Sequence, residues 1–258
     1  EQEIFSRLSG AEKRLLGAIA VFREPIPIHA VKQVEEGTDL LDELVEKGLA
    51  RQSDAENYDV HDLVREFLMR SMDDELRKEL HSTAVGWYRD KYDNAAYRIE
   101  FIHHLRHTGD DDGLAEVLLS EGHRLVRAGH TELLSILNTL DRNDFDAKSW
   151  GLIRELKGDI LSIQGRWDEA EIEYDAATRH VGRKISPELA RLLSARADIA
   201  VKRGAMDDAL ELHRKALQIQ THKDIRDAVG AARSYNNMGY IYRRRKDVRR
   251  ALEVYGNV

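Results

Sequence analysis

The chain of 258 residues contains no cysteine, which excludes disulfide bonds, thiolate metal sites and cysteine nucleophiles together. Its longest unbroken apolar run, Ala18 to Phe22, is too short to span a bilayer, and its first residues do not resemble a signal peptide. We therefore expect a cytoplasmic protein without a membrane partner. A hydrophobic share of 42% is too high for a disordered chain.

Proline is almost as scarce as cysteine. The three prolines stand at positions 25, 27 and 187, so residues 28–186 contain none. Proline breaks helix interiors, and a long proline-free stretch rich in leucine, alanine, glutamate and arginine favours one helix after another. The composition thus predicts a mostly helical protein.

The sequence also lacks the common catalytic and nucleotide-binding motifs. There is no Gly-x-x-x-x-Gly-Lys-Ser/Thr, Gly-x-Gly-x-x-Gly, Gly-x-Ser-x-Gly or His-Glu-x-x-His. The 47 acidic residues offer many carboxylate pairs, but none has a distinguishing context. We predict no enzyme, no catalytic residue and no cofactor within this chain.

Residues 1–72 have an organisation of their own. Apolar spacing, capping residues and turn signals predict three helices, a hairpin and a fourth helix. The helices are expected at residues 11–22, 28–34 and 39–47, the hairpin at 49–60, and the last helix from His61 onwards. This order of elements predicts a winged-helix domain, in which the hairpin forms a small β wing.

The charge of this region bears on what it can bind. Winged helices often bind DNA through a basic third helix, since phosphate neutralisation supplies most of the non-specific affinity. Residues 1–75 carry eighteen acidic and nine basic side chains, and residues 39–47 carry four acids against Lys47. The charge disfavours nucleic acid as a partner, and a DNA-binding transcription regulator is the weakest of our hypotheses.

The tripeptide Val60-His61-Asp62 follows the predicted wing and opens the last helix. In this place it resembles the Met-His-Asp signature of the STAND signal-transduction ATPases of the NB-ARC type. The resemblance implies that His61 touches the β-phosphate of ADP, with Asp62 holding the loop or the imidazole. It also implies an upstream nucleotide-binding domain that carries ADP or ATP in a longer parent protein. The simpler alternative is that His61 links wing to helix and Asp62 caps the first turn.

Residues 73–146 are predicted to be an irregular helical connector, and they contain a group of histidines. His103 and His107 lie one helical turn apart beside His104, and three aspartates follow at residues 110–112. Such a pair of histidines could share a metal ion, but no third ligand has a defined spacing. The alternative is a polar helix end that leads into a solvated acidic turn, and we predict no metal site.

Beyond residue 146 the chain repeats itself. Three small residues are each followed twelve positions later by an alanine. The pairs are Gly158 with Ala170, Ala197 with Ala209, and Gly239 with Ala251. Aromatic Tyr174 and Tyr255 share a phase that His213 occupies in the middle copy. Small residues at fixed positions predict helix pairs whose members approach closely.

This repeat resembles the tetratricopeptide repeat, most clearly in residues 235–242 and 250–255. Successive copies are 39 and 42 residues apart, longer than the usual period of about 34. We predict a solenoid of such repeats over residues 147–258, with the last repeat incomplete, as in an excised piece of a larger protein. The basic run at residues 243–246 is expected at the turn inside that last repeat, as a solvated loop.

A stack of helix pairs presents a concave face to ligands. The side chains expected on this face are Lys202, Asn236, Tyr240 and Arg243. They are candidates for binding a protein or peptide, and the alternative is that they are solvated decoration of a scaffold.

The predicted fold is therefore all-α with a small β wing, a winged helix followed by a tetratricopeptide-like solenoid. The function favoured by these features is the regulatory, partner-binding part of a STAND-type ATPase switch. A non-enzymatic interaction scaffold, whose winged helix is only structural, is the alternative.

Overall fold

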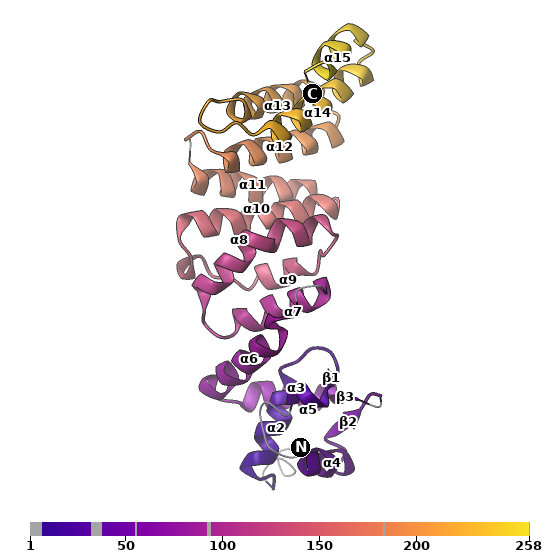
Figure 1. The fold of residues 1–258 in the computed structure, drawn as a ribbon, viewed down its shortest axis with the longest axis vertical. Coiled ribbons are helices and arrows are strands. Elements are labelled where there is room, and N and C mark those ends of the chain that lie inside the picture. Colours follow the sequence, from indigo (N-terminus) through magenta and orange to yellow (C-terminus); the bar gives the residue numbers. More distant parts are fainter. Residues whose placement is uncertain (1–6, 32–37, 55, 92–93, 183, 258) are drawn as a thin grey trace. The chain divides into compact units, whose positions relative to one another are not determined.

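The computed structural model describes residues 7–31, 38–54, 56–91, 94–182 and 184–257. They form two compact units, Glu1–Leu114 and Ala115–Val258, called unit 1 and unit 2 below (Figure 1). Most described residues are helical, as expected from the composition. Within the described ranges, no helix combines the length and the apolar character that crossing a membrane requires. The three-part division at residues 72 and 146 stays a prediction.

Unit 1 begins with α2 (Gly10–Ala20), whose start is held by a reciprocal cap. The Ser9 hydroxyl accepts from the Glu12 amide at 3.2 Å, and the Glu12 carboxylate accepts from the Ser9 amide at 2.7 Å. Such a capping box satisfies two amides that the first turn leaves unpaired. The helices that follow are α3 (Ile28–Val31), α4 (Thr38–Glu46) and α5 (Asp62–Ser71).

A three-stranded antiparallel sheet lies among these helices. It consists of β1 (Ile26–Pro27), β2 (Ala50–Gln52) and β3 (Asn57–Val60) in the order β1-β3-β2. The hairpin of β2 and β3 is confirmed, whereas strand β1 was not expected. Its proline explains its place, because a residue without an amide hydrogen is tolerated on an edge strand. The hairpin tip closes on Asp54, whose carboxylate accepts from the amides of Glu56 and Asn57.

The predicted boundaries of this region agree in part with the structure. The predicted helix at 28–34 is described only as Ile28–Val31, and residues 32–34 lie outside the described residues. The third helix ends as expected, since Gly48 follows it with a φ of 67°. A positive φ is readily adopted by glycine, which makes it a common stop after a helix.

The rest of unit 1 is a pair of helices, α6 (Asp74–Arg89) and α7 (Ala95–Arg106). Asp73 and Asn94 cap them, each accepting hydrogen bonds from first-turn amides. The apolar side chains at their contact are almost fully buried, among them Leu80, Ala84 and Ile102. Helix α8 (Asp111–Arg127) then carries the chain into unit 2.

After α8, the described part of unit 2 contains a short helix, a 3-10 turn and six longer helices that follow one another as neighbouring layers (Figure 1). They are α9 (Leu133–Leu137), η1 (Arg142–Asp144), α10 (Ala147–Ile163), α11 (Trp167–Val181), α12 (Pro187–Lys202), α13 (Met206–Gln220), α14 (Ala228–Arg244) and α15 (Val248–Tyr255). Ser186 caps α12 and Pro187 occupies its first turn, where proline lacks only an amide that would be unpaired anyway.

Close approach within the helix pairs is confirmed. A side chain added at Gly158 would stand 2.5 Å from the Tyr174 ring, and one added at Gly239 would overlap the Tyr255 ring. These are the small residues and aromatics that recur at the repeat spacing. In these two pairs the repeated positions are therefore the ones at which the helices pack, because an aromatic ring of one helix lies against the glycine backbone of the other.

Candidate functional site

The best candidate site in unit 2 is a cavity of about 430 Å³. Its walls come from every second helix, namely α8, α10, α12 and α14, with one residue from α11. The residues used below are Asp159, Ser162, Tyr174, Asp198, Lys202, Asn237 and Tyr240. We call this cavity the central groove.

Polar side chains of the central groove are tied to one another. The Tyr174 hydroxyl donates to the Asp159 carboxylate at 2.7 Å, and the Asn237 amide donates to the Asp198 carboxylate at 3.1 Å. The Lys202 ammonium donates to the Ser162 hydroxyl at 3.1 Å. These bonds connect α10 with α11, α12 with α14, and α10 with α12, so the groove is pre-formed.

Tyr240 supplies the aromatic surface at this site. It is 37% exposed although it is a large apolar ring. The guanidinium groups of Arg243 and Arg244 lie 5.7 and 5.9 Å from its ring centre. Both arginines are exposed. A ring with cations on one side can stack on a ligand and still leave the charges available to it.

The groove candidates from the sequence are brought together only in part. Lys202 and Tyr240 line the cavity, while Asn236 and Arg243 are exposed and do not appear among its described lining residues. The neighbouring Asn237 lines it instead, because α14 is rotated so that Asn237 meets Asp198. The residues that were missed, Asp159 and Asp198, directly follow Gly158 and Ala197. Tyr240 directly follows Gly239 in the same way, so the three residues occupy equivalent positions of their repeats. That equivalence could have identified both aspartates as groove residues from the sequence.

A second cavity of about 470 Å³ lies at the other end of α10 and α12. Its lining residues come from α8, from α10, from the end of α11, from the loop residues just before α12 and from α12 itself, and they are Leu119, Ala147, Lys148, Ser149, Leu152, Glu155, His180, Val181, Lys184, Ile185, Ser186, Glu188 and Arg191. Glu155, only 4% exposed, accepts from Arg191 at 2.9 and 3.2 Å. Burial raises the pKa of the Glu155 carboxyl, and Arg191 acts in the opposite direction. We call this cavity the loop pocket.

His123 stands between the two cavities. Its ring nitrogens lie 3.6 Å from Glu155, which lines the loop pocket, and 3.5 Å from Asp159, which lines the central groove. The two cavities therefore share one polar wall along α10.

His61 and Asp62 are both exposed at the start of α5. The His61 side chain makes no capping hydrogen bond to the helix. Below them, Asp59 is buried and binds Arg51 at 2.6 Å and Arg65 at 2.5 Å. Arg65 also donates to the carbonyl of Ala20 at the end of α2. This network anchors the start of α5 and leaves the imidazole of His61 on the surface.

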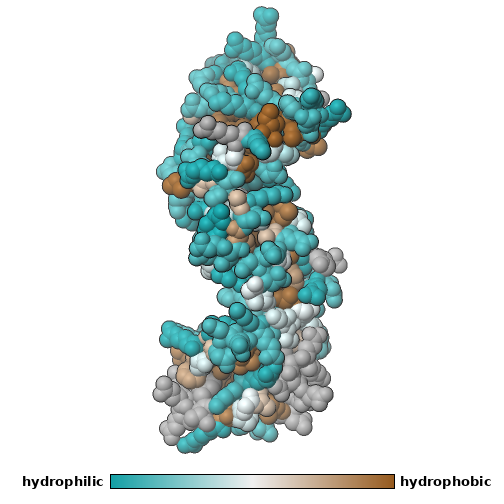
Figure 2. All heavy atoms as spheres, turned by 90° about the vertical axis from the view of Figure 1, so that its left-hand side faces the viewer, coloured by the Kyte–Doolittle hydropathy of each residue, from teal (hydrophilic) through white to brown (hydrophobic). Residues whose placement is uncertain are grey.

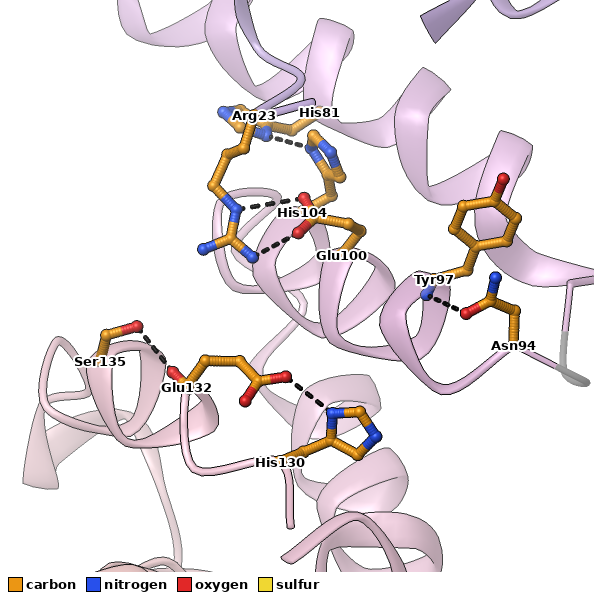
Figure 3. A network of polar contacts seen from close by, with 9 residues as sticks. All are labelled: Arg23, His81, Asn94, Tyr97, Glu100, His104, His130, Glu132 and Ser135. Atoms are coloured by element: carbon orange, nitrogen blue, oxygen red, sulfur yellow. Dashed lines mark hydrogen bonds and ion pairs between the residues drawn. The ribbon is translucent and has the colours of Figure 1, made fainter. Parts of the chain in front are cut away.

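The histidines at the end of α7 differ in burial, since His104 is buried, His103 is half-buried and His107, which follows the helix, is exposed. His104 is fully buried and its Nδ1 lies 2.9 Å from Nδ1 of His81 on α6 (Figure 3). The ring of His107 stacks on His81 with centres 4.5 Å apart. Among the residues that the structure describes, no group of three or more potential ligands is arranged to hold a metal ion.

Burial alters the protonation of these histidines. It lowers the pKa of His81 to about 3, with further lowering by the charges of His107 and Arg77. It also lowers the pKa of His104 far below its usual value, and His81 adds to that effect. Arg23 lies nearby but is paired with Glu100, to which it donates at 2.6 and 3.1 Å (Figure 3). Both imidazoles are therefore neutral near pH 7.

The basic run at residues 243–246 lies where it was expected, at the turn between α14 and α15. Lys246 adopts a φ of 62° in this turn, and all four side chains are exposed. Arg245 is not without a partner, because it pairs with Asp207 of α13 at 2.7 Å.

Comparisons with known proteins identify the repeat. Residues 188–256 match the tetratricopeptide repeat family, a repeat that generally binds protein partners. No curated protein matches the chain. One similar solved structure is a STAND protein with a tetratricopeptide repeat sensor from Pyrococcus horikoshii, with a TM-score of 0.43, 17% identity, and coverage of 98% of this chain and 50% of that one. Another is BtubC (BKLC) from P. vanneervenii, with a TM-score of 0.43, 21% identity and 72% of each chain covered. This chain thus spans half the length of the Pyrococcus protein.

Proposed function

We propose that unit 2 binds a segment of a partner protein in the central groove. The observation that carries this proposal is that every second helix from α8 to α14 contributes residues to one cavity. A stack of repeats buries its core between neighbours and leaves such an extended surface for ligands.

The chemistry of the groove suits an extended peptide. Lys202 offers an ammonium to a carbonyl or carboxylate, and Asn237 and Asp198 can pair with a peptide backbone. The half-exposed ring of Tyr240 can cover an apolar side chain. Asn236 and Arg243, which are exposed beside the cavity, remain candidates for contacts at its rim.

The groove is tested by selecting twelve-residue peptides from a displayed random library on the immobilised 258-residue chain. We expect Tyr240→Ala and Lys202→Glu each to weaken a selected peptide by about tenfold, a loss of roughly 1.4 kcal/mol. Tyr97→Ala is the matched control, because Tyr97 is a similarly exposed tyrosine of unit 1, at 42%. If no peptide is enriched, or if the groove variants bind as well as the unmodified chain, the proposal is wrong.

We further propose that the chain is the regulatory part of a STAND-type ATPase switch. In this proposal residues 1–72 are a winged-helix domain, and the parent protein carries an upstream domain that binds ADP or ATP. His61 contacts the β-phosphate of ADP, and Asp62 holds the loop or the imidazole. The support is the tripeptide Val60-His61-Asp62 together with its setting, an exposed imidazole at a helix start directly after a hairpin.

The local structure is compatible with this role. Backbone amides at the start of a helix and the helix dipole favour an anion, and a histidine there can donate to phosphate. The Asp59–Arg65 ion pair fixes the start of α5 against α2, so a ligand on His61 would act on an anchored element. Asp62, in the first turn, carries a negative charge that would oppose an anion bound there.

The test uses a parent protein that contains this chain and a P-loop domain. His61→Ala should accelerate release of bound ADP by about tenfold, since one charge-assisted hydrogen bond is worth roughly 1.5 to 3 kcal/mol. His29→Ala, at another exposed histidine of the same unit, is the control. Unchanged ADP release would remove His61 from the sensor role and favour the plain scaffold.

The remaining hypotheses are separated by simpler observations. A parent gene without a P-loop favours a non-enzymatic scaffold. Binding of duplex DNA by the chain at low salt would favour a DNA-binding regulator. We expect none, because residues 1–75 have twice as many acidic as basic side chains.

A further inference from the structure

The loop pocket differs from the central groove in what it exposes. Four aliphatic side chains line it, Leu119, Leu152, Val181 and Ile185. Two of them lie largely in solvent, with Leu119 at 55% and Ile185 at 53% exposure. Large aliphatic side chains that surround a cavity of about 470 Å³ and remain exposed to solvent indicate a surface that another molecule covers. In Figure 2 such hydrophobic areas stand out as small separate patches on an otherwise hydrophilic face.

The charges around the pocket are not balanced. Its two acidic side chains, Glu155 and Glu188, both face Arg191, which binds Glu155 through two hydrogen bonds and whose pKa Glu188 helps to raise. Lys148 and Lys184 are exposed, and within the described part of the chain neither ammonium forms a salt bridge or a hydrogen bond, although the charge of Lys148 helps to lower the pKa of the nearby Asp146 carboxyl. Two ammonium groups therefore stand at an apolar cavity without a salt-bridged carboxylate, and Asp146, the acid that interacts with Lys148, is not among the lining residues of the pocket.

Local structure holds these groups in place. Gly182 ends α11 with a φ of 79°, and Ser186 caps α12 by accepting from the Leu189 amide at 3.2 Å. Ile185 stands directly before this cap. At the start of α10, Asp146 caps the helix by accepting from the Ser149 amide at 2.7 Å, which fixes the turn that carries Lys148.

We propose that the loop pocket binds an acidic, apolar peptide segment of the partner, in which a large apolar side chain stands next to an aspartate, a glutamate or a C-terminal carboxylate. The apolar side chain enters between Leu119, Leu152 and Ile185, and the carboxylate meets Lys148 and Lys184. This inference rests on the proposed peptide-binding function of unit 2. It adds a second subsite and its chemistry, since the polar wall of α10 joins the pocket to the central groove.

The experiment compares peptide selections on three forms of the full chain. They are the unmodified chain, the charge-reversed Lys148→Glu/Lys184→Glu and the apolar-to-polar Ile185→Asp. We expect the unmodified chain to enrich peptides with a large apolar residue within two positions of an acid. The charge-reversed form should exchange this acid for lysine or arginine, and Ile185→Asp should lose the apolar preference. Lys13→Glu/Lys78→Glu, with the same change of charge on exposed lysines of unit 1, is the matched control.

Affinities then decide between the outcomes. For a peptide selected on the unmodified chain and labelled with fluorescein, both loop-pocket variants should bind at least about tenfold more weakly, and the control double variant within about twofold. Circular dichroism of each variant checks the fold. Unchanged affinity in the charge-reversed form overturns the inference.

Failure of this inference is distinguishable from failure of the central groove. If peptides bind and only Lys202→Glu and Tyr240→Ala weaken them, the groove stands and the loop pocket does not. If no peptide is enriched, both fail. If decanoate binds and depends on the same lysines while peptides do not, the pocket takes a small amphiphile and the peptide proposal is overturned.

Discussion

In the α10–α11 pair of unit 2, the ring of Tyr174 lies against the bare backbone of Gly158. In the α6–α7 pair of unit 1, the contact between the helices includes a polar one, made by two buried imidazoles, His81 and His104. The first contact, of ring carbons against backbone, depends mainly on shape. The second depends on both rings being neutral. The comparison shows that two kinds of contact join helices in this chain. The first is weakened when a side chain fills the space at the glycine, and the second is weakened when an imidazole takes up a proton.

The largest expected effect comes from filling the space at Gly158. Gly158→Leu should destabilise unit 2 by about 3 kcal/mol, because the added side chain cannot coexist with the Tyr174 ring without moving a packed helix. Urea denaturation followed by circular dichroism measures the loss. A change below 1 kcal/mol would contradict the idea that close approach determines this contact.

The middle repeat offers a way to sharpen that test. It carries Ala197 where the first has Gly158, and His213 where the first has Tyr174. Gly158→Ala and Tyr174→His should therefore each destabilise unit 2, and the double variant should recover about 1 kcal/mol relative to the sum of the two. Strict additivity in the double-mutant cycle would show that the two positions do not share one space.

The second prediction concerns pH and unit 1. In the unfolded chain His81 takes up a proton near pH 6.5, whereas in the folded chain it does so only near pH 3. Unfolding therefore binds protons, and the stability present above pH 6.5 is lost as pH falls through this window. Because the unfolded chain binds this proton and the folded chain does not, the free energy of unfolding of unit 1 should fall by about 2 kcal/mol per buried imidazole between pH 7 and pH 5.

Hydrogen exchange by mass spectrometry, corrected for the intrinsic effect of pH, reports α6–α7 and α10–α11 separately. Helix α13 is left out of the comparison, because burial lowers the pKa of its own His213 to about 4. Protection should fall more in α6–α7 than in α10–α11. His81→Leu/His104→Leu should reduce the fall, since apolar groups of similar size replace both hydrogen-bond partners at small cost. It should not remove the fall completely, because burial also lowers the pKa of His103 to about 3. His222→Gln in unit 2 is the control. Equal loss of protection in both helix pairs would contradict the difference drawn between them.

The smallest predicted effect uses a glycine that no helix approaches. Gly86 lies inside α6, is exposed, and an added side chain would meet nothing within 4 Å. Gly86→Ala should therefore stabilise unit 1 by about 1 kcal/mol through helix propensity. The same type of residue thus gives opposite signs at positions 86 and 158. A destabilising Gly86→Ala, measured by thermal unfolding, would remove the contrast.

Local signals in the sequence were sufficient for much of the fold. Ser9, Ser186, Pro187 and Gly48 mark helix ends through bonds within a few residues, so they could be interpreted without tertiary contacts. The repeat of small residues was likewise visible, because the same contact recurs at a nearly fixed distance along the chain. Strand β1 was missed, since two residues with a proline pair with β3 only after the chain has folded back.

The candidate site was harder to predict. Neighbouring positions on a helix differ by about 100° in direction. The rotation of α14 about its own axis therefore decides whether Asn236 or Asn237 faces the groove, and the structure has Asn237 there. The histidines of α7 presented a similar difficulty. Their sequence pattern suggested a metal site or a polar helix end, whereas His104 is buried against His81, more than twenty residues away.

The amino-acid sequence by itself determined the helices, the hairpin, the repeat and the acidity of the first 75 residues, because each depends on composition or on contacts between near neighbours. Only the tertiary structure decided which polar groups face a cavity, which imidazoles are buried, and where two lysines stand beside exposed aliphatic side chains. Those properties depend on how helices are rotated against one another, and packing sets that rotation through contacts between residues distant in the chain.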